Sequence, residues 1–316
     1  MDSPFIYQKP VEGKAFIARH AESDALTGIL RSGGSAIICE PPKSGKTSLI
    51  RHAVQLLRSQ GEAFAYAEVN MMTVRTSGAF AHKLSEALTV AFADMQETME
   101  DADAAQMLSL ACSTAASKGM RLILVLDEFH CLDSCEDGDD VMRGMEKVMQ
   151  EMPQVQGKPA CSLVFCGGQV NAMKEIFRHR KRFWRQAEQV PFAPVDEKDF
   201  VEHVLRGFIT SGKVMDRKLI GGACEMLKCN LWYLNHFISI CDSLSKGYIM
   251  EPALAEALDK LVAVHEPRFV ETMYNLTTFQ VSMLKAILDG NTKFSAMNSF
   301  TSSMSKTPIL SNVDFN

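Results

Sequence analysis

The sequence has no long hydrophobic run and no recognisable export signal. No apolar stretch in its 316 residues reaches the ~18 residues that a bilayer-spanning helix needs. The opening residues, Met1-Asp2-Ser3-Pro4-Phe5, contain no positively charged region followed by an apolar one, which is the pattern of a signal peptide. We therefore expect no membrane association and a cytoplasmic location.

The chain also lacks an excess of basic residues. Lysine and arginine together number 33, against 38 aspartates and glutamates, which gives a formal net charge of -5. The isoelectric point is about 5.9. A protein that coats nucleic acid along its whole surface has the opposite balance. Binding to DNA would therefore depend on a local basic patch.

The nine cysteines are an odd number, and several of them (Cys39, Cys161 and Cys166) lie inside apolar runs. This distribution predicts reduced, buried thiols rather than a disulfide framework. Two further cysteines and a histidine lie within residues 130–135. Their spacing fits no standard zinc pattern and no second pair follows, so we expect no zinc site.

The segment from Glu40 to Ser48 reads Glu-Pro-Pro-Lys-Ser-Gly-Lys-Thr-Ser. It follows a strand-like apolar run at 36–39 and opens a run with helical spacing at 46–59. A strand, a tight loop, Gly-Lys-Thr and a helix start are together the context of a phosphate-binding P-loop. The backbone N–H groups of the loop and the positive end of the helix would hold phosphate oxygens.

Two side chains of this loop have specific predicted roles. Lys46 would reach the terminal phosphates of a nucleotide, and the hydroxyl of Thr47 would ligate Mg²⁺. Glu40 stands where the motif usually has its first glycine, and it would bring negative charge near the phosphates. The nucleotide-binding set is predicted to comprise Pro42, Lys43, Ser44, Gly45, Lys46, Thr47 and Ser48.

Residues 122–126 are an unbroken apolar run that ends in Asp127 and Glu128, a Walker B pattern. Such a run predicts a parallel strand that is buried on both faces. The carboxyl end of that strand is where a doubly wound sheet places its ligand site. Asp127 would hold Mg²⁺, and Glu128 would orient or deprotonate an attacking water. The alternative is a core strand that ends in two solvated charges. His130 is interpreted as a loop residue that could also tune the site.

The order of elements predicts an α/β fold with three parts. Strand and helix patterns alternate over residues 1–194, which favours a parallel sheet with helices on both faces. Helical patterns with no strand between them predict a separate helical lid over 195–267. Residues 268–316 form a third segment, with one helix expected at 278–288. The lid helices are expected at 196–209, 219–227, 231–244 and 253–264.

The order of these motifs resembles the P-loop ATPases of the AAA+/STAND type, and in particular the prokaryotic archaeal-type ATPase family, as found in bacteria such as Bacteroides. The resemblance covers nearly the whole chain. It implies a P-loop ATPase sheet, a helical lid and a winged-helix-like C-terminal segment, with ATP and Mg²⁺ as ligands. The matching segments include Phe16-Ile17-Ala18-Arg19 and Leu126-Asp127-Glu128-Phe129-His130. The P-loop and Walker B boxes are shared by many families, and their combination with Arg182-Phe183-Trp184-Arg185 and Leu276-Thr277-Thr278-Phe279-Gln280 is much more specific.

The chain departs from this family at three places. Gly168 stands where the family has a serine whose hydroxyl could sense the terminal phosphate, which leaves Gln169 or Asn171 as substitutes. The lid stretch Cys229-Asn230-Leu231 lacks the Gly-x-Pro element that contacts nucleotide in STAND proteins. A winged helix would extend beyond Asn316, so its last part is expected to be shortened. This shortening puts DNA binding in doubt more than nucleotide binding.

The strongest basic cluster lies between residues 178 and 185. One of its arginines could contact a terminal phosphate as an arginine finger, in cis or from a neighbouring subunit. The cluster could instead contact nucleic-acid phosphates or form a solvated helix face. We favour Arg185 as the catalytic arginine because Phe183 and Trp184, interpreted as core residues, would anchor it. The cluster comprises Arg178, Arg180, Lys181, Arg182 and Arg185.

Three functions are compatible with this sequence. The first is a slowly hydrolysing, Mg²⁺-dependent ATPase that acts as a molecular switch, in which ATP or ADP sets the arrangement of the lid and the C-terminal segment. The second is a DNA-associated ATPase of the initiator or transposition-helper type. The third is a nucleotide-binding scaffold that does not hydrolyse. We favour the first over the DNA-associated ATPase, and a homo-oligomer and a protein partner remain open.

Overall fold

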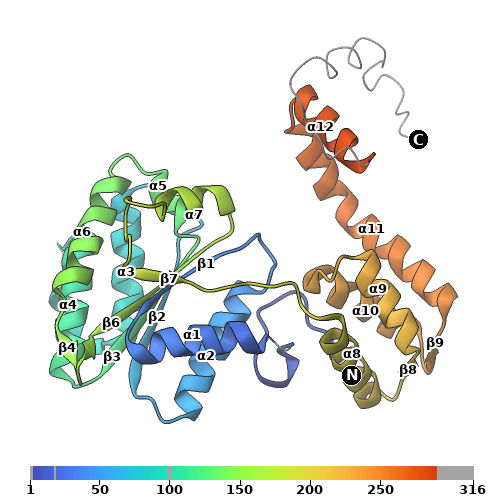
Figure 1. Ribbon diagram of the computed structural model, residues 1–316, viewed down its shortest axis with the longest axis horizontal. Helices are drawn as coiled ribbons and strands as arrows, with labels where there is room; N and C mark the ends of the chain where they lie inside the picture. Colours follow the sequence, from blue (N-terminus) through green and yellow to red (C-terminus); the bar gives the residue numbers. More distant parts are fainter. Residues whose placement is uncertain (1–2, 18, 99–101, 290–316) are drawn as a thin grey trace. The chain divides into compact units, whose positions relative to one another are not determined.

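The computed structural model describes residues 3–17, 19–98 and 102–289. Its centre is a five-stranded sheet in the order β2-β3-β6-β1-β7, and all its strand pairs are parallel. The arrangement confirms the predicted α/β fold (Figure 1). The strands are β1 (Ser35–Cys39), β2 (Phe64–Asn70), β3 (Arg121–Asp127), β6 (Cys161–Gly167) and β7 (Ala187–Gln189).

Two layers of helices cover the sheet because successive strand residues point to opposite faces. Ile37, Leu124 and Phe165 belong to one buried cluster, while the neighbouring residues Ile38 and Val125 belong to the other. The first face packs against α3 (Ser77–Ala91), α4 (Ala104–Ser117) and α6 (Gly138–Glu151). The second packs against α1 (His20–Ser32) and α2 (Lys46–Ser59). Burial on both faces explains why these strands have unbroken apolar runs.

Shorter elements connect these layers. They are the 3₁₀ turns η1 (Gly13–Ala15) and η2 (Ala93–Thr98), the helices α5 (His130–Asp133) and α7 (Val170–Ile176), and the hairpin strands β4 (Gln154–Val155) and β5 (Lys158–Pro159). The helical sequence pattern of residues 77–99 does not form one helix, because α3 ends at Ala91 and the 3₁₀ turn η2 follows it.

The lid has the predicted helices together with a pair of strands that the sequence pattern does not indicate. Asp196, Asp216 and Asn230 each accept a hydrogen bond from a backbone N–H in the first turn of their helix, which fixes where the three helices begin. The strands are two residues long, too short to give an alternating pattern. The elements are α8 (Glu197–Ser211), β8 (Val214–Met215), α9 (Arg217–Met226), α10 (Leu231–Leu244) and β9 (Tyr248–Ile249).

The chain divides into two compact units, Met1–Leu258 and Asp259–Asn316. Helix α11 (Glu251–Tyr274) runs from the first unit into the second, so the boundary expected between residues 267 and 268 lies inside one helix. Helix α12 (Thr278–Leu288) begins at Thr277, which forms a capping box with Gln280. The remainder of the predicted winged-helix-like segment, from residue 290, lies outside the described residues. The three-domain division stays a prediction.

One cysteine pair differs from the expectation of reduced thiols. Cys224 and Cys229 form a disulfide, with their Cα atoms 4.7 Å apart. After α9 the backbone turns through left-handed residues at Lys228 and Cys229 (φ 51° and 50°). The turn is closed by a hydrogen bond from the Cys229 N–H to the Cys224 carbonyl. This turn, which the sequence pattern does not reveal, brings the two sulfurs together. The other seven cysteines are free, as expected.

In the described part of the chain, no helix combines the length and apolar character required to cross a bilayer.

The segment before α1 is anchored in the lid. The Phe5 side chain is 2% exposed and packs edge-on against Phe208 of α8, with ring centroids 4.8 Å apart. A Cβ added at Gly207 would lie 2.6 Å from the Phe5 ring, so glycine is the residue that lets the ring approach the helix. Tyr7 stacks on His236 of α10 with a centroid separation of 3.9 Å. This segment, the described residues before His20, is called the lead-in below. It therefore contacts two lid helices, α8 and α10.

Replacing Phe5 with alanine is expected to lower the free energy of unfolding by about 3–5 kcal/mol, because a fully buried ring is lost and leaves a cavity. Urea unfolding followed by circular dichroism measures this loss. Phe269, which is 51% exposed, provides the matched control, since Phe269→Ala removes the same atoms from a position near solvent. An equal loss in both variants would contradict the anchoring role of Phe5.

Candidate functional site at the carboxyl edge of the sheet

The loop between β1 and α2 has the backbone shape of a P-loop. Lys43 and Gly45 are in the left-handed region, with φ 66° and 98°. Gly45 is the N-cap of α2 and provides no side-chain cap, so the first N–H groups of the helix are not satisfied by a capping side chain. Uncapped amides at a helix N-terminus, together with the helix dipole, form a site for an anion.

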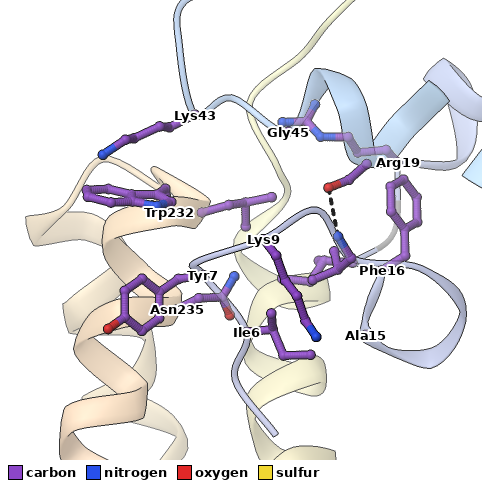
Figure 2. A pocket seen from close by; sticks show the side chains of 14 residues that line it. Ile6, Tyr7, Lys9, Ala15, Phe16, Arg19, Lys43, Gly45, Trp232 and Asn235 are labelled. Atoms are coloured by element: carbon purple, nitrogen blue, oxygen red, sulfur yellow. Dashed lines mark hydrogen bonds between the residues drawn. The ribbon is translucent and has the colours of Figure 1, made fainter. Parts of the chain in front are cut away.

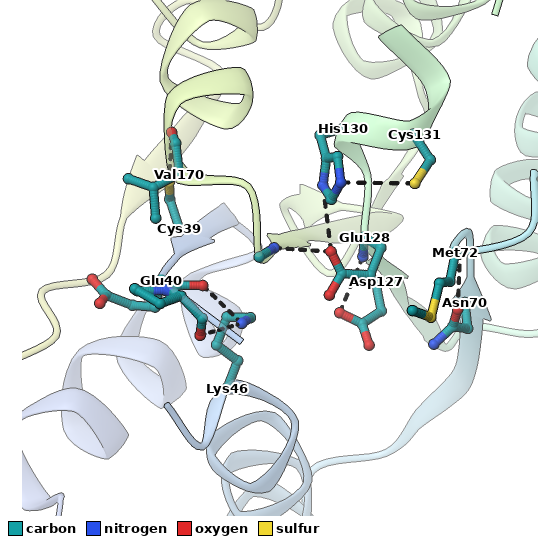
Figure 3. A network of polar contacts seen from close by, with 12 residues as sticks. Cys39, Glu40, Lys46, Asn70, Met72, Asp127, Glu128, His130, Cys131 and Val170 are labelled. Carbon is teal, nitrogen blue, oxygen red and sulfur yellow. Dashed lines mark hydrogen bonds and ion pairs between the residues drawn. The ribbon is translucent and has the colours of Figure 1, made fainter. Parts of the chain in front are cut away.

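Lys46 is folded back over this loop. Its side chain is only 6% exposed, and Nζ donates hydrogen bonds to the carbonyl oxygens of Glu40 at 2.8 Å and Pro41 at 2.9 Å (Figure 3). Among the described residues, the ammonium therefore has only neutral backbone acceptors at hydrogen-bond distance. A phosphate oxygen would be a stronger acceptor for it than these carbonyls.

Glu40 does not place its carboxylate beside the Lys46 ammonium. Figure 3 shows the carboxylate directed away from Lys46 and Asp127, while the backbone carbonyl of Glu40 accepts the lysine hydrogen bond. Burial raises the pKa of Glu40, and the charges of Lys46 and Arg19 partly oppose that rise. The expected conflict between Glu40 and phosphates is therefore reduced by the orientation of its side chain.

Asp127 ends β3 directly opposite Asn70, the last residue of β2. Burial raises the pKa of its carboxyl group; a hydrogen bond with Cys166 lowers it, and the neighbouring charge of Glu128 raises it further. The Asp127 Oδ1 atom accepts the N–H of Glu128 at 3.1 Å. A carboxylate kept in a partly buried position at a cost is a candidate ligand for a cation.

Glu128 lies just beyond β3 in a left-handed conformation, with φ 57°. For a residue other than glycine this conformation costs about 1–3 kcal/mol and is typical of functional sites. Its Oε2 atom accepts the N–H of Gly168 at 2.9 Å and lies 3.4 Å from Nδ1 of His130. The carboxylate is therefore fixed at the end of β6, the strand adjacent to the P-loop strand (Figure 3).

The structure gives a steric reason for the glycine at position 168. A Cβ atom there would lie 3.2 Å from both carboxylate oxygens of Glu128 and 3.2 Å from Cγ of Pro42. These contacts are tighter than van der Waals contacts, so a serine would have to displace the carboxylate or the loop. The absence of a serine hydroxyl at position 168 is thus explained by the position of the Glu128 carboxylate.

A small pocket lies beside the P-loop, between the lead-in and the lid (Figure 2). Lys43, Gly45 and Ser48 contribute from the loop and the start of α2. The Ser48 Oγ atom accepts the N–H of Val11 at 3.1 Å, which ties the lead-in to this helix. The lead-in and the lid contribute Ile6, Tyr7, Phe16, Leu231, Trp232 and Asn235.

Trp232 and Arg19 are the residues of this region that the sequence patterns do not assign to the site. The Lys43 ammonium lies 3.1 Å from the centre of the Trp232 ring, so the lid directly contacts the loop. Arg19 is buried and donates to the carbonyl oxygens of Ser44 at 3.3 Å and Ala193 at 2.7 Å. It thereby joins the P-loop to the segment that leads into the lid. In the sequence, Arg19 belongs to the Phe16–Arg19 motif, which indicates only the segment before the first helix. No local sequence pattern indicates that Trp232 contacts the P-loop.

Most side chains of the basic cluster form ion pairs with nearby acidic side chains. Arg182 contacts Asp139 at 2.6 Å and Glu146 at 3.7 Å, and its contact with Asp139 raises the pKa of Arg182. Both Arg178 and Lys181 pair with Glu175. Phe183 is confirmed as a core residue at 1% exposure, whereas Trp184 is 36% exposed.

Arg185 and the P-loop lie at opposite ends of the strands of the sheet. Its guanidinium stacks over Trp184, 4.3 Å from the ring centre. Arg185 precedes Ala187, the first residue of β7, which pairs with Ser35, the first residue of β1. The P-loop instead follows Cys39, the last residue of β1. An arginine-finger role for Arg185 stays a prediction, and this topology favours a neighbouring subunit over the same chain.

The residues at this edge fit a nucleotide with Mg²⁺. Among the described residues, no three His, Cys, Asp or Glu side chains gather as a metal-binding group of their own. Asp127 and Thr47 would therefore be partial ligands for a cation that phosphate oxygens also bind, which is how Mg²⁺ is usually held. The uncapped start of α2 and the buried Lys46 supply the matching anion site.

Comparison with known proteins agrees with this geometry at the level of the fold. No family model matches the sequence. The human cell division control protein 6 homolog is 29% identical to this chain over 131 residues, which is 40% of this chain and 22% of that protein. The matched part thus spans about a fifth of the length of that curated relative.

Similar solved structures cover most of the chain. A Walker-type ATPase of Pyrococcus abyssi gives a TM-score of 0.74 at 15% identity, over 97% of this chain and 89% of that one. Aeropyrum pernix ORC2, with ADPNP and ADP, gives 0.61 at 15% identity over 91% and 78%. ORC1 of the same organism, in complex with DNA, gives 0.59 at 15% identity over 90% and 75%. The fold is that of a P-loop NTPase.

Replacing Asp127 with asparagine is expected to raise the melting temperature of the nucleotide-free protein by a few degrees and to remove the effect of Mg²⁺ on nucleotide binding. The amide avoids the cost of burying a charge and can still accept the Glu128 N–H. Thermal melts with and without Mg²⁺ and ATP measure both effects.

Asp139→Asn is the control for this change. The hydrogen bond from Arg182 lowers the pKa of Asp139, so loss of its charge should not raise the melting temperature. If Asp127→Asn destabilised the free protein, or if Mg²⁺ had no effect on the unmutated protein, the proposed metal role of Asp127 would be wrong.

Proposed function

We propose that this protein binds ATP with Mg²⁺ at the carboxyl edge of its sheet, hydrolyses it slowly, and uses the nucleotide state to control the lid. The observation that carries the proposal is the meeting of four features at one edge. These are the uncapped start of α2, the folded-back Lys46, the partly buried Asp127, and the fixed carboxylate of Glu128.

In this proposal the loop from Pro42 to Ser48 wraps the phosphates with backbone N–H groups. Lys46 exchanges its two carbonyl acceptors for oxygens of the terminal phosphates. Thr47 and Asp127 hold Mg²⁺, which when bound neutralises phosphate charge. The adjoining pocket, lined by the aromatic rings of Phe16, Trp232 and Tyr7, suits the flat, apolar faces of a nucleobase.

Glu128 is the residue proposed to orient and deprotonate the attacking water. Its carboxylate is fixed by the Gly168 N–H and its backbone holds a left-handed conformation. Both features keep the base in one orientation before the substrate arrives, which lowers the entropy cost of the reactive arrangement. Slow turnover is proposed because a switch must remain in the ATP-bound state long enough to act.

The contacts between the P-loop and the lid support a switch. Trp232 of α10 contacts Lys43, while Arg19 bonds both to the P-loop and to the segment that leads into α8. A nucleotide in the pocket would touch the loop, the lead-in and the lid together. Its differential contacts in the ATP and ADP states would therefore bias the lid.

A DNA-associated ATPase is the second candidate. It is favoured by the likeness to an ORC1 protein solved in complex with DNA and to a human cell division control protein. The acidic net charge of -5 counts against it, so the switch remains our preferred function. Arg185 lies just before β7, next to the start of β1, whereas the P-loop follows the end of β1. If Arg185 acts as an arginine finger, it would therefore do so in a neighbouring subunit, and the active form would be a homo-oligomer.

We also propose a cytoplasmic location and a protein partner.

Glu128→Gln is expected to lower ATP turnover by about 10²–10⁴-fold while ATP and Mg²⁺ still bind. The amide keeps an oxygen for the Gly168 N–H but cannot take a proton from water. Phosphate release is measured for both proteins, with and without duplex DNA. Wild-type turnover in the variant would show that Glu128 is not the base.

The same measurements separate the candidate functions. Stimulation by DNA favours the initiator-like ATPase, and turnover that DNA leaves unchanged favours the switch. Bound but unhydrolysed ATP in the unmutated protein favours the non-hydrolysing scaffold.

Lys46→Ala is expected to weaken ATP binding about 10- to 100-fold, because a charge-assisted contact with the phosphates is lost. The affinity for ATP is measured by tryptophan fluorescence. The chain has two tryptophans, and replacing Trp184 with phenylalanine leaves Trp232, which contacts Lys43 of the P-loop, as the reporter. Lys118→Ala, which removes an exposed lysine paired with Asp94, should bind like the parent protein. Unchanged affinity in a folded Lys46→Ala protein would refute the proposed site.

A further inference from the structure

Two nitrogen atoms converge on one oxygen of Glu128. The Gly168 amide donates a hydrogen bond to Oε2 at 2.9 Å. Nδ1 of the buried His130 lies 3.4 Å from the same oxygen (Figure 3), a close contact without hydrogen-bond geometry that leaves Nδ1 with no hydrogen-bond partner among the described residues. The other oxygen, Oε1, accepts no hydrogen bond from the part of the chain that the structure describes. The carboxylate is thus held through one oxygen, and the second oxygen remains available to a substrate water.

His130 is built into the core and is not the loop residue suggested by its position in the sequence. It is the first residue of α5 and is 6% exposed. A Cβ added at Gly167 would lie 3.2 Å from its Nδ1, so the imidazole ring packs directly against the backbone of β6. Phe129 beside it is fully buried. The ring therefore has little freedom to turn away from Glu128.

The neighbouring thiol favours the tautomer that has its proton on Nδ1. The Cys131 Sγ atom lies 3.8 Å from Nε2 of His130. Burial raises the pKa of Cys131, and the charge of Glu128 raises it further, so the thiol keeps its proton and can donate it to Nε2. An imidazole that accepts at Nε2 donates at Nδ1, which faces Glu128.

We propose that His130 is a positioning residue for ATP hydrolysis: its Nδ1–H, together with the Gly168 N–H, holds Oε2 of Glu128 so that Oε1 accepts the proton of the attacking water. This inference rests on the hydrolysis proposed above. Glu128 has a left-handed backbone, and its carboxylate accepts the Gly168 N–H at the end of β6. A hydrogen bond from the adjacent His130 Nδ1, 3.4 Å away, would fix the last torsion of the side chain. Without the histidine donor the carboxylate would rotate and lose its alignment with the water.

The test compares three variants of the full chain at position 130. His130→Asn places an amide nitrogen near the position of Nδ1, whereas His130→Gln places its amide near the position of Nε2. His130→Leu removes both donors. We expect kcat to fall about 10- to 100-fold in His130→Leu and His130→Gln, and His130→Asn to recover most of the rate. The affinity for ATP, measured by Trp232 fluorescence, should stay unchanged in all three.

A double variant checks that His130 acts through Glu128. Adding His130→Leu to Glu128→Gln should cause no further loss of turnover, because residues that act as a unit are not additive. Additive losses would overturn the inference. If His130→Leu does not fold, the comparison of His130→Asn with His130→Gln still decides, since both are polar amides that differ in reach.

Each remaining outcome has a definite meaning. Unchanged kcat in His130→Leu would overturn the inference while leaving the ATPase proposal intact. Equal losses in all three variants, with lower melting temperatures, would show a structural role only. A higher kcat in His130→Leu would show that the histidine holds Glu128 away from its substrate. No turnover in the unmutated protein would refute the proposed hydrolysis itself, and the inference with it.

Discussion

The parallel pairing of β6 with both β1 and β3 fixes the geometry on which the site depends. Cys39 pairs with Gly167, and Leu126 pairs with Phe165. Because the strands are parallel, their carboxyl ends lie at one edge of the sheet. Two further backbone hydrogen bonds, from the Glu40 N–H to Gly167 and from the Phe129 N–H to Cys166, extend this alignment beyond the strands. A slip of one residue would turn the apolar side chains of a strand to the wrong face, so burial on both sides locks the register.

Unfavourable local features gather at this edge of the sheet. Asp127 is held where burial raises its pKa, and Glu128 is held in a left-handed conformation. Lys46 is buried against backbone carbonyls. The apolar core on either side of the sheet stabilises the fold enough to tolerate these costs. Strain and buried charge that persist at one edge support a functional site there, since neither improves stability.

The lead-in connects this edge to the lid. Phe5 inserts against α8, and Tyr7 stacks on α10, while Arg19 bonds to the P-loop carbonyl of Ser44. The segment that precedes the first helix is therefore a structural component of the pocket beside the P-loop. Packed and hydrogen-bonded side chains therefore connect the P-loop with the lid.

Local patterns in the sequence were sufficient for the main strands of the sheet, for the lid helices and for naming the candidate residues at the sheet's carboxyl edge. The apolar runs of β1, β3 and β6, the Gly-Lys-Thr helix start and the two carboxylates after β3 each follow from side-chain types within a few residues of one another. The helix starts in the lid were also readable, because Asp196 and Asn230 cap them directly. Such features depend on neighbours in the chain, which the sequence displays.

What the sequence could not determine depends on residues distant along the chain. The contact of Trp232 with Lys43 and the stacking of Tyr7 on His236 join segments separated by most of the first unit. The bond from Gly168 to Glu128 explains a glycine that looked like a missing serine. The Cys224–Cys229 disulfide depends on a left-handed turn at Lys228 and Cys229, which the residue types there do not predict. By itself the sequence determined the α/β pattern and the identity of the charged groups. Only the tertiary structure decided which of those groups meet, because packing across the sheet sets the distances between them.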